Sequence, residues 1–447
     1  MILSELSFQA DIQDRNSKEK KKMKRCMFSL ALGLLLSALP AWAYDISDLL
    51  EAVAGQPAME LSELAVRESE SQVEEARAAL YPKVSLFGRT ESYDSPTNLR
   101  PMPPTEVDIA AGDSIPFSRD ILRYGVTLEM PLYAKQLYTL QEKLKLLGDR
   151  AGLEHRINLI SRQSAVLAAN SSYLYLVHLD KAVAARIDSL ETTGREVEMK
   201  VKNGRAAESE LYKISNSINE LKQQRNSITA RIADVRSDLK QLTGIDLAAP
   251  VAMELTGTMT GSDFITEQKI AKEVAAAEKE AQRSREARYP VLSLYGTLSG
   301  NDGEAYNTDE HIYRSYNYGG VKLQMPLFDR TIGSGEELAD IRLNQARKKL
   351  AQTRIELAAL ADNLAEKLPL LDQSLTLTRE TEKNSRELLT TAKVSFTAGR
   401  MTMEEYLRYE SQLLTAQAAV EEVQSQRWQL WSQQAVLYGI DLRGVVR

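Results

Sequence analysis

The sequence has few of the residues on which most enzymes and disulfide-stabilised domains depend. Its 447 residues include one cysteine, three histidines, 13 prolines and 22 glycines. One cysteine excludes an intramolecular disulfide, and the scarcity of glycine and proline predicts a mainly helical chain. The histidines, His155, His178 and His311, share no metal-ligand spacing, and no nucleophile elbow, P-loop or paired-carboxylate motif is present. We therefore expect no enzymatic activity, no cofactor and no bound metal.

The N-terminus has the three parts of a secretory signal peptide. A basic run, an apolar run and a small-residue cleavage site follow one another at 18–25, 27–39 and 41–43. This pattern predicts cleavage before Tyr44 and export. The apolar run is too short for an uncleaved membrane anchor. A start at Met23 would give a more ordinary signal, so residues 1–22 are a candidate start-site artefact.

The mature chain is acidic and has no long apolar segment. Removal of residues 1–43 takes away seven Lys or Arg and four Asp or Glu, so the net charge falls from −6 to −9, which excludes nucleic acid as the expected partner. Cys26 lies within the signal, so the mature chain has no thiol to oxidise or lipidate. No later segment approaches about 18 consecutive apolar residues. If the protein crosses a membrane, we expect it to do so as β-strands.

Two stretches 195 residues apart, 201–247 and 396–442, share one pattern. Each has Gly-Arg near its start and ends in Gly-Ile-Asp-Leu. Apolar residues between these ends recur at steps of three and four, the heptad pattern of a coiled coil. Because 195 is not a multiple of seven and the shared ends are not heptad features, the match indicates an internal duplication.

Each half also contains a predicted β-hairpin. Apolar and polar residues alternate in YPKVSLFGR and YGVTLEMP and again in YPVLSLYGT and GGVKLQMP. The alternation predicts strands of about eight or nine residues with one apolar face. Polar stretches at 91–119 and 299–315 are the expected hairpin loops. The strand-to-helix junctions are predicted at Pro82, Pro131, Pro290 and Pro326, and a membrane-boundary belt at Tyr81, Tyr124, Tyr133, Tyr289 and Phe328.

These elements divide the chain into two repeats. The first, 44–247, has a hairpin at 83–130, a long helix at 132–203 and a second helix at 206–243. The second, 264–447, has a hairpin at 291–325, a long helix at 327–397 and a second helix at 402–438. Residues 248–263 are the linker, expected against the outside of the helices. Pro369 is expected to kink the second long helix.

Four strands with open edges cannot span a bilayer alone, because every backbone N–H and C=O in lipid needs a partner. Two chains would form an eight-stranded barrel, which fills with its own side chains. Three chains would give twelve strands and leave a channel. We therefore predict a mainly α fold with a membrane β-barrel portion. Four strands per chain contribute to a 12-stranded trimeric barrel, and the long helices continue it as a periplasmic coiled-coil barrel.

The chain resembles the TolC family of outer-membrane efflux proteins. The resemblance lies in the order of its elements, which occurs twice: helix, strand, hairpin, MPLY or MPLF, long helix, Gly-Arg turn, heptad helix and Gly-Ile-Asp-Leu. The resemblance covers essentially the whole mature chain. It implies a homotrimeric channel in the outer membrane of a Gram-negative bacterium, surrounded by outer-membrane lipid, with a large periplasmic portion. It also implies a periplasmic adaptor (membrane fusion protein) and an inner-membrane pump as partners. Drugs, metal ions and proteins are all cargo of this family.

The resemblance assigns a role to the two helix-to-helix turns, 203–210 and 398–405. Two antiparallel helices reverse there, and glycine supplies the left-handed conformation that a helix C-terminus favours. In the family these turns form the periplasmic tip that contacts the adaptor. The corresponding residues are Gly204, Arg205, Gly399 and Arg400.

An acidic residue near the pore entrance follows six positions after each glycine in the family, which corresponds to Glu210 and Glu405. Three Glu405 carboxylates meeting at a constriction would favour cations; alternatively, a Glu in a first helical turn only complements the helix dipole. Met401 stands where better known exporters have an arginine of the closing bridge. The predicted entrance residues are therefore Glu210, Glu404, Glu405, Arg400 and Arg408.

Two other classes of protein fit part of the pattern. A soluble periplasmic adaptor or scaffold would also carry a coiled-coil hairpin, but adaptors usually have one, whereas this sequence has two equivalent ones and strands with one apolar face. Recovery from the soluble periplasmic fraction would favour the adaptor. An inner-membrane pump subunit would need a transmembrane helix after the signal.

Overall fold

The computed structural model describes residues 44–101, 107–108, 110–259, 261–308 and 310–447. It separates Met1–Asp45 from a second unit, Ile46–Arg447. The helices and strands of the described residues belong to this second unit. The predicted signal peptide, with Cys26 and Met23, lies outside the described residues.

The corresponding helices of the two halves have equal lengths. The long helices α4 (Lys135–Lys202) and α7 (Arg330–Thr397) each have 68 residues, about 100 Å at about 1.5 Å per residue. They are followed by the 36-residue helices α5 (Glu208–Thr243) and α8 (Met403–Tyr438). The hairpins are preceded by the 22-residue helices α3 (Pro57–Ala78) and α6 (Ile265–Glu286). The shorter elements are α2 (Ile46–Ala54) and the 3-10 helix η2 (Leu442–Gly444).

Within the described residues, no helix is both long and apolar enough to cross a lipid bilayer.

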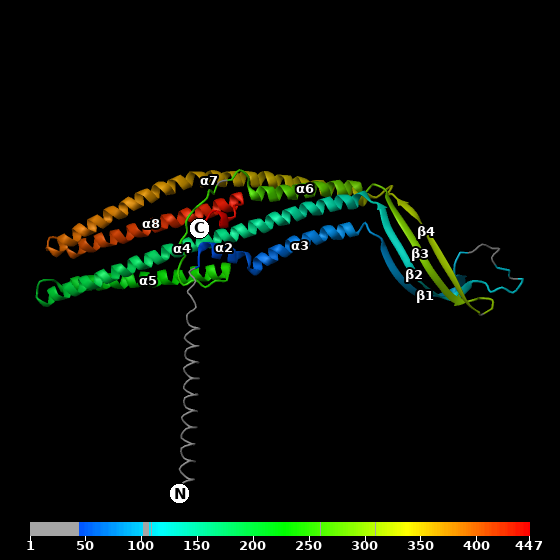
Figure 1. The fold of residues 1–447 in the computed structure, drawn as a ribbon, viewed down its shortest axis with the longest axis horizontal. Coiled ribbons are helices and arrows are strands. Elements are labelled where there is room, and N and C mark those ends of the chain that lie inside the picture. Colours follow the sequence, from blue (N-terminus) through cyan, green and yellow to red (C-terminus); the bar gives the residue numbers. More distant parts are fainter. Residues whose placement is uncertain (1–43, 102–106, 109, 260, 309) are drawn as a thin grey trace, which may run out of the picture. The chain divides into compact units, whose positions relative to one another are not determined.

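Helix α7 continues without a break through Pro369 and curves gently along its length (Figure 1). A proline removes one backbone hydrogen bond from a helix. The flanking turns of α7 keep theirs, so the helix is not interrupted at this residue.

The four strands form one antiparallel sheet in the order β1-β2-β3-β4. They are β1 (Lys83–Asn98), β2 (Phe117–Tyr133), β3 (Val291–Glu304) and β4 (His311–Gln324). The central pair, β2 and β3, joins the two halves, and β1 and β4 are the edges.

The prediction of strands of eight or nine residues is wrong: the four strands have 14 to 17 residues. Much of the segment expected as loop is strand, since Glu91 still pairs with Ile121 and Glu304 with His311. Alternation reveals only the part of a strand that has an apolar face. Backbone pairing continues beyond it, because ladder hydrogen bonds need no apolar side chains.

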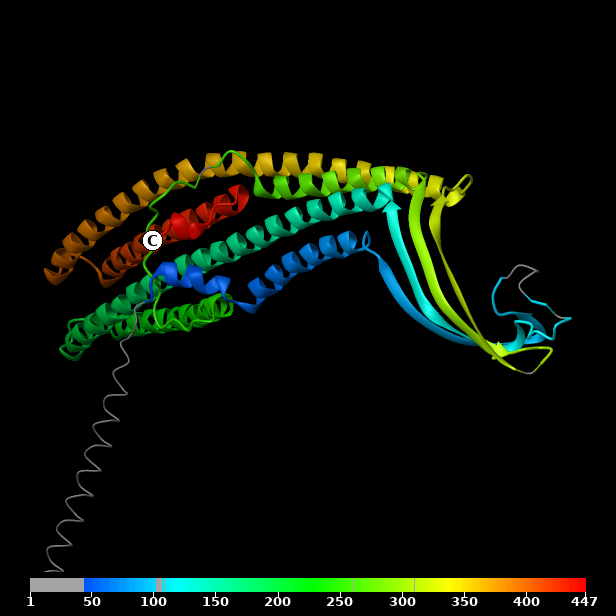
Figure 2. The same ribbon diagram turned by 45° about the vertical axis from the view of Figure 1, so that its right-hand side comes forward.

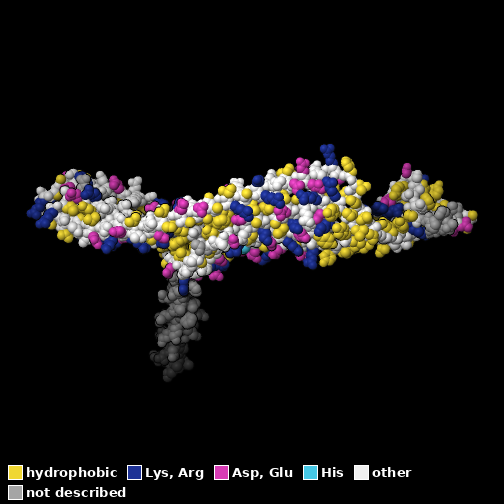
Figure 3. Space-filling view, turned by 90° about the horizontal axis from the view of Figure 1, so that it is seen from above, with side chains coloured by type: hydrophobic (Ala, Val, Ile, Leu, Met, Phe, Trp, Pro, Cys, Tyr) yellow, Lys and Arg dark blue, Asp and Glu magenta, His cyan; other side chains and the backbone are white. Residues whose placement is uncertain are grey.

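The register divides the sheet into two faces. Paired residues lie on the same face, and the pairs Val84–Leu128 and Val126–Leu298 belong to a face that we call the apolar face. It comprises Val84, Leu86, Leu122, Tyr124, Val126, Leu128, Leu294, Leu298, Val321 and Leu323. Many of these side chains are exposed, with Leu86 85% and Leu323 68% accessible. Hydrophobic side chains gather where the strands join the helices (Figure 3). The opposite face, which we call the polar face, carries Ser, Thr, Asn, Lys and Arg side chains together with Phe and Tyr rings.

The strands lie at one end of the helices, and the α4–α5 and α7–α8 turns lie at the other (Figures 1 and 2). Towards the turns α4 packs against α5 and α8, and towards the strands it packs against α3 and α6. Helix α7 packs on α6 and α8. The largest apolar core lies midway, where α2 packs on α4 and η2.

The segment between α5 and α6 is fixed to this middle region. Asn170 of α4 donates to the carbonyl of Val251 at 2.7 Å and accepts from its N–H at 3.0 Å. Glu254 and Arg447 exchange two backbone hydrogen bonds of 2.7 and 2.9 Å. The predicted linker is thus ordered against α4 and the last residues of the chain.

Ion pairs hold α6 on both sides. Its pairs with α4 are Lys143–Glu280, Arg150–Glu273, Lys269–Glu154, Lys272–Asp149 and Lys279–Glu142. Its pairs with α7 are Arg285–Asp340, Arg347–Glu278, Lys349–Glu273 and Arg354–Glu267. Between these rows α6 buries the small side chains Ala276 and Ala281. Glu280 accepts from both Arg283 and Lys143, and these hydrogen bonds lower the pKa of its carboxyl to about 2.

Substitution Glu280→Gln is expected to lower the free energy of unfolding by about 1 kcal/mol at neutral pH, because it removes a carboxylate that two cations stabilise. The unfolded carboxyl binds its proton near pH 4.5 and the folded one near pH 2. The stabilisation is therefore complete above pH 4.5 and is lost as the pH falls towards 2. Urea unfolding at neutral and acidic pH measures the difference.

The control is Glu278→Gln, because the Glu278–Arg347 pair is about half exposed on both sides. We expect it to cost less than about 0.5 kcal/mol. Equal effects of the two substitutions, or an effect of Glu280→Gln that does not shrink in acid, would contradict the assignment.

Candidate functional site

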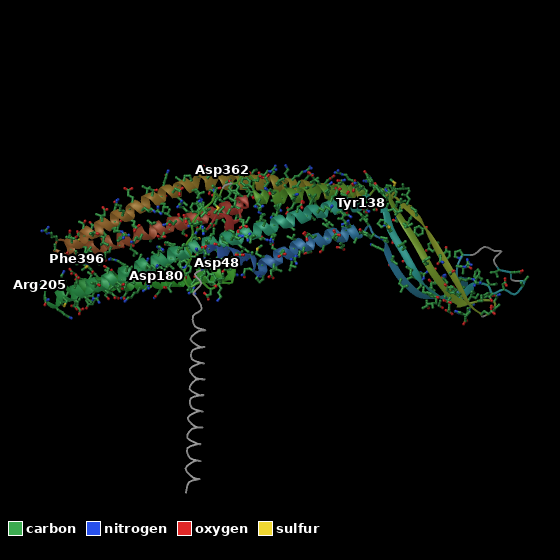
Figure 4. All side chains as sticks on the ribbon, in the orientation of Figure 1. Asp48, Tyr138, Asp180, Arg205, Asp362 and Phe396 are labelled. Atoms are coloured by element: carbon green, nitrogen blue, oxygen red, sulfur yellow. The ribbon has the colours of Figure 1, made fainter. Side chains whose placement is uncertain are left out.

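The two helix-to-helix turns have the same backbone. Gly204 and Gly399 have φ of +67° and +71°, a left-handed conformation that strains residues with a Cβ. In the next residue of each turn, the Arg205 N–H donates to the Lys200 carbonyl at 2.8 Å and the Arg400 N–H donates to the Ser395 carbonyl at 2.9 Å. These bonds close the last helical turn in the manner of a Schellman motif. Both arginine side chains are exposed, and Figure 4 marks the turn end with Arg205 and Phe396.

An apolar cluster packs the two turns against each other. The rings of Phe396 and Tyr406 stack at 4.9 Å, and the Lys200 ammonium lies 5.1 Å from the Phe396 ring centre. Met401 packs against this cluster. The position where the resemblance expects a bridging arginine is therefore occupied by a side chain that stabilises the turn through apolar contact.

A groove opens between α5 and α8, and part of its lining comes from α4. Arg186 and Leu190 of α4 line it together with residues of the two flanking helices. Its charged residues on α5 and α8 are Glu210, Lys213, Glu220, Glu405 and Arg408. The structure thus brings three of the predicted entrance residues together. Arg400 is exposed at the turn outside this lining, and the side chain of Glu404 lies outside what the structure describes.

Glu405 caps its own helix. Its carboxylate accepts hydrogen bonds from the Thr402 N–H at 3.0 Å and the Thr402 hydroxyl at 2.9 Å, and Glu405 N–H donates back to that hydroxyl. This is a capping box. The hydrogen bonds from Thr402, backbone first, and the charge of Arg408 lower the pKa of Glu405. These contacts support the interpretation that Glu405 stabilises the start of its helix. Because its pKa is lowered, the carboxylate is charged in the groove.

A buried ion pair joins α4 to α8 at the groove. The guanidinium of Arg186 on α4 contacts the carboxylate of Glu410 on α8, and both side chains are less than a tenth exposed. Arg186 also donates to the carbonyl of Leu407 at 2.9 Å, and Ser189 donates to Glu410. Burial lowers the pKa of Arg186 to about 10, so it is still charged at neutral pH.

Sequence reasoning missed this pair because no motif links Arg186 to Glu410, which lies on another helix. Arg186 lies between the buried residues Val183, Ile187 and Leu190. A charge inside an apolar seam is the signal that could have identified it, since such a charge needs a partner from a facing helix.

Three of the four prolines predicted at strand-to-helix junctions lie next to strands. Pro82 and Pro290 precede β1 and β3, and Pro326 follows β4. Pro131 lies inside β2 rather than at its end, beside a register irregularity between Pro131 and Tyr133. A bulge tolerates a residue that lacks an N–H. Of the residues predicted for the aromatic belt at strand ends, Tyr124 lies inside β2. The strand begins at Phe117, earlier than the alternating pattern predicts.

The histidines form no common site. His178 lies 3.3 Å from Glu421 and His311 lies 3.0 Å from Asp302. Among the described residues, no group of three or more His, Cys, Asp or Glu is placed to hold a metal ion.

The second half of the chain matches a known family. Residues 268–437, which contain β3, β4, α7 and nearly all of α8, fit the family model described as outer membrane efflux protein. This part of the chain is therefore similar to outer membrane efflux proteins. No curated protein matches the sequence.

Solved outer-membrane channels have the same fold as this chain. VceC of Vibrio cholerae is 14% identical with a TM-score of 0.73 over 87% of this chain and 95% of VceC. The Campylobacter jejuni channel CmeC is 15% identical with a TM-score of 0.71 over 88% and 84%. The open state of Neisseria gonorrhoeae MtrE is 12% identical with a TM-score of 0.70 over 88% of each chain. The predicted TolC-like fold class is confirmed.

The match bears on the classes of protein considered from the sequence. Outer membrane efflux proteins are channels of the outer membrane with a large periplasmic helical portion, so the match favours a channel over the soluble adaptor. Channels of the family are trimeric and work with adaptors and inner-membrane pumps.

The buried Arg186–Glu410 pair can be tested by comparing single and double substitutions. Glu410→Leu is expected to lower the free energy of unfolding by about 3 kcal/mol, because it leaves the Arg186 charge buried without its partner. Arg186→Met combined with Glu410→Leu should be within about 1 kcal/mol of the wild type, since neither charge remains. Thermal unfolding of the detergent-solubilised protein measures both. A double variant as unstable as the single variant would show that the pair is not the source of the effect.

Proposed function

We propose that three copies of this chain form one duct, which receives solutes from a periplasmic adaptor and an inner-membrane pump and carries them across the periplasm and the outer membrane. The observation that supports this most is the pair of open edges of the sheet. β1 and β4 each have a neighbour on one side only, and in lipid an unpaired row of backbone groups is too costly to persist.

The edges suit each other. All neighbouring strands are antiparallel, so β4 runs opposite to β1, and β4 of one chain beside β1 of the next continues the same pattern. The helical edges are also apolar: α3 exposes Leu61 and Leu64, and α7 exposes Ile355, Leu370 and Leu377. Three chains give twelve strands, enough for an open bore.

The duplication supplies the register of the proposed seam. Val126 pairs with Leu298 between β2 and β3. Applying the repeat offsets of 195 and 208 residues, Val126 corresponds to Val321 and Leu298 to Thr90. Val321 of one chain should therefore face Thr90 of the next on the apolar face.

Oxidation of a Thr90→Cys, Val321→Cys variant in membranes is expected to give covalent trimers on a denaturing gel. The mature chain has no cysteine of its own, so the background is clean. Val126→Cys with Leu298→Cys is the matched control, because these neighbours pair within one chain and should oxidise without a change of size. Val84→Cys with Val321→Cys is out of register and should stay monomeric. Trimers absent from the first variant while the control oxidises would refute the proposed closure.

At the other end, we propose that Gly204, Arg205, Gly399 and Arg400 form the tip that contacts the adaptor, and that Glu210 and Glu405 lie at the pore entrance. Glu405→Gln is expected to reduce block of single-channel current by multivalent cations, because it removes negative charge while a glutamine can still cap α8. Glu198→Gln is the control, because Glu198 lies near the neighbouring α4–α5 turn but outside the lining of the groove. Unchanged block in Glu405→Gln would place the acidic ring elsewhere.

A further inference from the structure

We propose that the polar face of the sheet carries a binding belt for aromatic anions, formed by a row of arginines beside a patch of tyrosines. This rests on the proposed trimer, because the polar face becomes the wall of the bore only when the sheet closes with its apolar face towards lipid.

One row across the four strands carries the arginines. The register pairs Arg89 of β1 with Arg123 of β2, Arg123 with Asn301 of β3, and Asn301 with Arg314 of β4. All four side chains therefore lie on the polar face at one level. Three chains would bring nine arginines to this level of the bore.

Among the described residues, one carboxylate of each chain forms ion pairs with the row. Glu91 binds Arg89 at 2.8 Å and Arg123 at 2.7 Å. Arg314 has no carboxylate within ion-pair distance among the described residues; its guanidinium donates to the carbonyl of Tyr313. Asp120 and Asp302 are close in sequence to Arg123 and Asn301. In the sheet register they lie opposite residues of the apolar face, so their side chains point away from the row. Each chain thus adds a net charge of two positive units at this level.

The three arginines differ in accessibility. Arg123 is 16% exposed and donates to Asn301 at 2.9 Å and to the carbonyls of Leu99 and Asn98, so it holds the chain after β1 in place. Arg89 is 63% exposed, and Arg314 is partly exposed. Arg89 and Arg314 are therefore the two that a solute in the bore would meet.

Aromatic rings occupy the rows next to the arginines. Phe87 and Tyr316 lie in the first row towards the helices, Tyr318 in the second and Tyr295 in the third. The ring centres of Tyr316 and Tyr318 are 5.0 Å apart, and those of Tyr295 and Tyr318 are 6.3 Å apart. Neighbouring rows on one face are about 7 Å apart. A carboxylate or sulfonate bound by Arg314 could therefore place an attached ring on Tyr316 or Tyr318.

Carboxylates bind guanidinium groups through paired, charge-assisted hydrogen bonds, and tyrosine rings stack against flat apolar groups. Of the other charged groups of this face, Lys83, Glu129 and Lys322 lie nearer the helices, and Arg119 lies beyond the row towards the loops. They do not reverse the balance. The chemistry that fits the belt is thus a solute with an acidic group on an aromatic body.

Single-channel recording of the reconstituted trimer tests the belt. Benzene-1,3,5-tricarboxylate, an aromatic trianion, is added on the side of the strand loops and compared with citrate, a trianion without a ring. We expect both to block the current and the aromatic one to block more strongly. Arg89→Gln with Arg314→Gln should weaken block by both at least about fivefold, because six positive charges leave the trimer. Arg123 is left unchanged because it positions Leu99.

Two matched variants separate charge from structure. Arg89→Lys with Arg314→Lys keeps the charge and should keep most of the block by citrate. Tyr316→Leu with Tyr318→Leu should reduce block by the aromatic trianion to the level of citrate and leave citrate unchanged. Full block in the Arg→Gln variant, or equal loss in the Arg→Lys variant, would overturn the belt. A crosslinked trimer that conducts but is not blocked by trianions would overturn this inference alone, whereas absence of a trimer would overturn the proposed function as well.

Discussion

The constraint on which this structure depends is that backbone polar groups in lipid must be paired. A four-stranded sheet leaves one row of N–H and C=O groups open along β1 and another along β4, and no rearrangement within one chain removes both. The strands pair antiparallel from edge to edge, and each half supplies one hairpin. The duplication thus yields a sheet whose two edges are complementary in direction, which is the property that ring closure requires.

The helices meet a different requirement, because they are surrounded by water and must stay aligned over a long distance. Helix α6 is fastened to α4 and α7 by ion pairs that flank small buried alanines. The opposite part uses apolar seams and one buried pair, Arg186–Glu410. Each exposed ion pair adds little stability, but a row of them fixes the axial register of neighbouring helices. The exposed apolar side of α7 remains available for contact with a neighbouring chain.

Much of this architecture could be predicted from the sequence, because it follows from local rules. Gly204 and Gly399 identify the turns through their conformation, the heptads identify the paired helices, and strand alternation identifies the apolar face. The full strand length could not be predicted, since residues after Glu91 pair through their backbones without an apolar pattern. The arginine row was also invisible. Arg89, Arg123 and Arg314 are far apart in the sequence, and only the register of three strand pairs places them at one level. The partner of Arg186 is more than two hundred residues away, so its packing depends on tertiary structure alone.

The two turns at the far end of the helices have the same backbone but begin their second helices differently. Thr402 and Glu405 cap the start of α8 through reciprocal hydrogen bonds. Helix α5 starts after Ala207, whose side chain makes no capping hydrogen bond. A helix start without a cap unwinds more readily than a capped one. In the proposed trimer, capped and uncapped helix starts would therefore alternate around the tip. A widening of the tip would then begin at the three uncapped turns rather than at six equivalent ones.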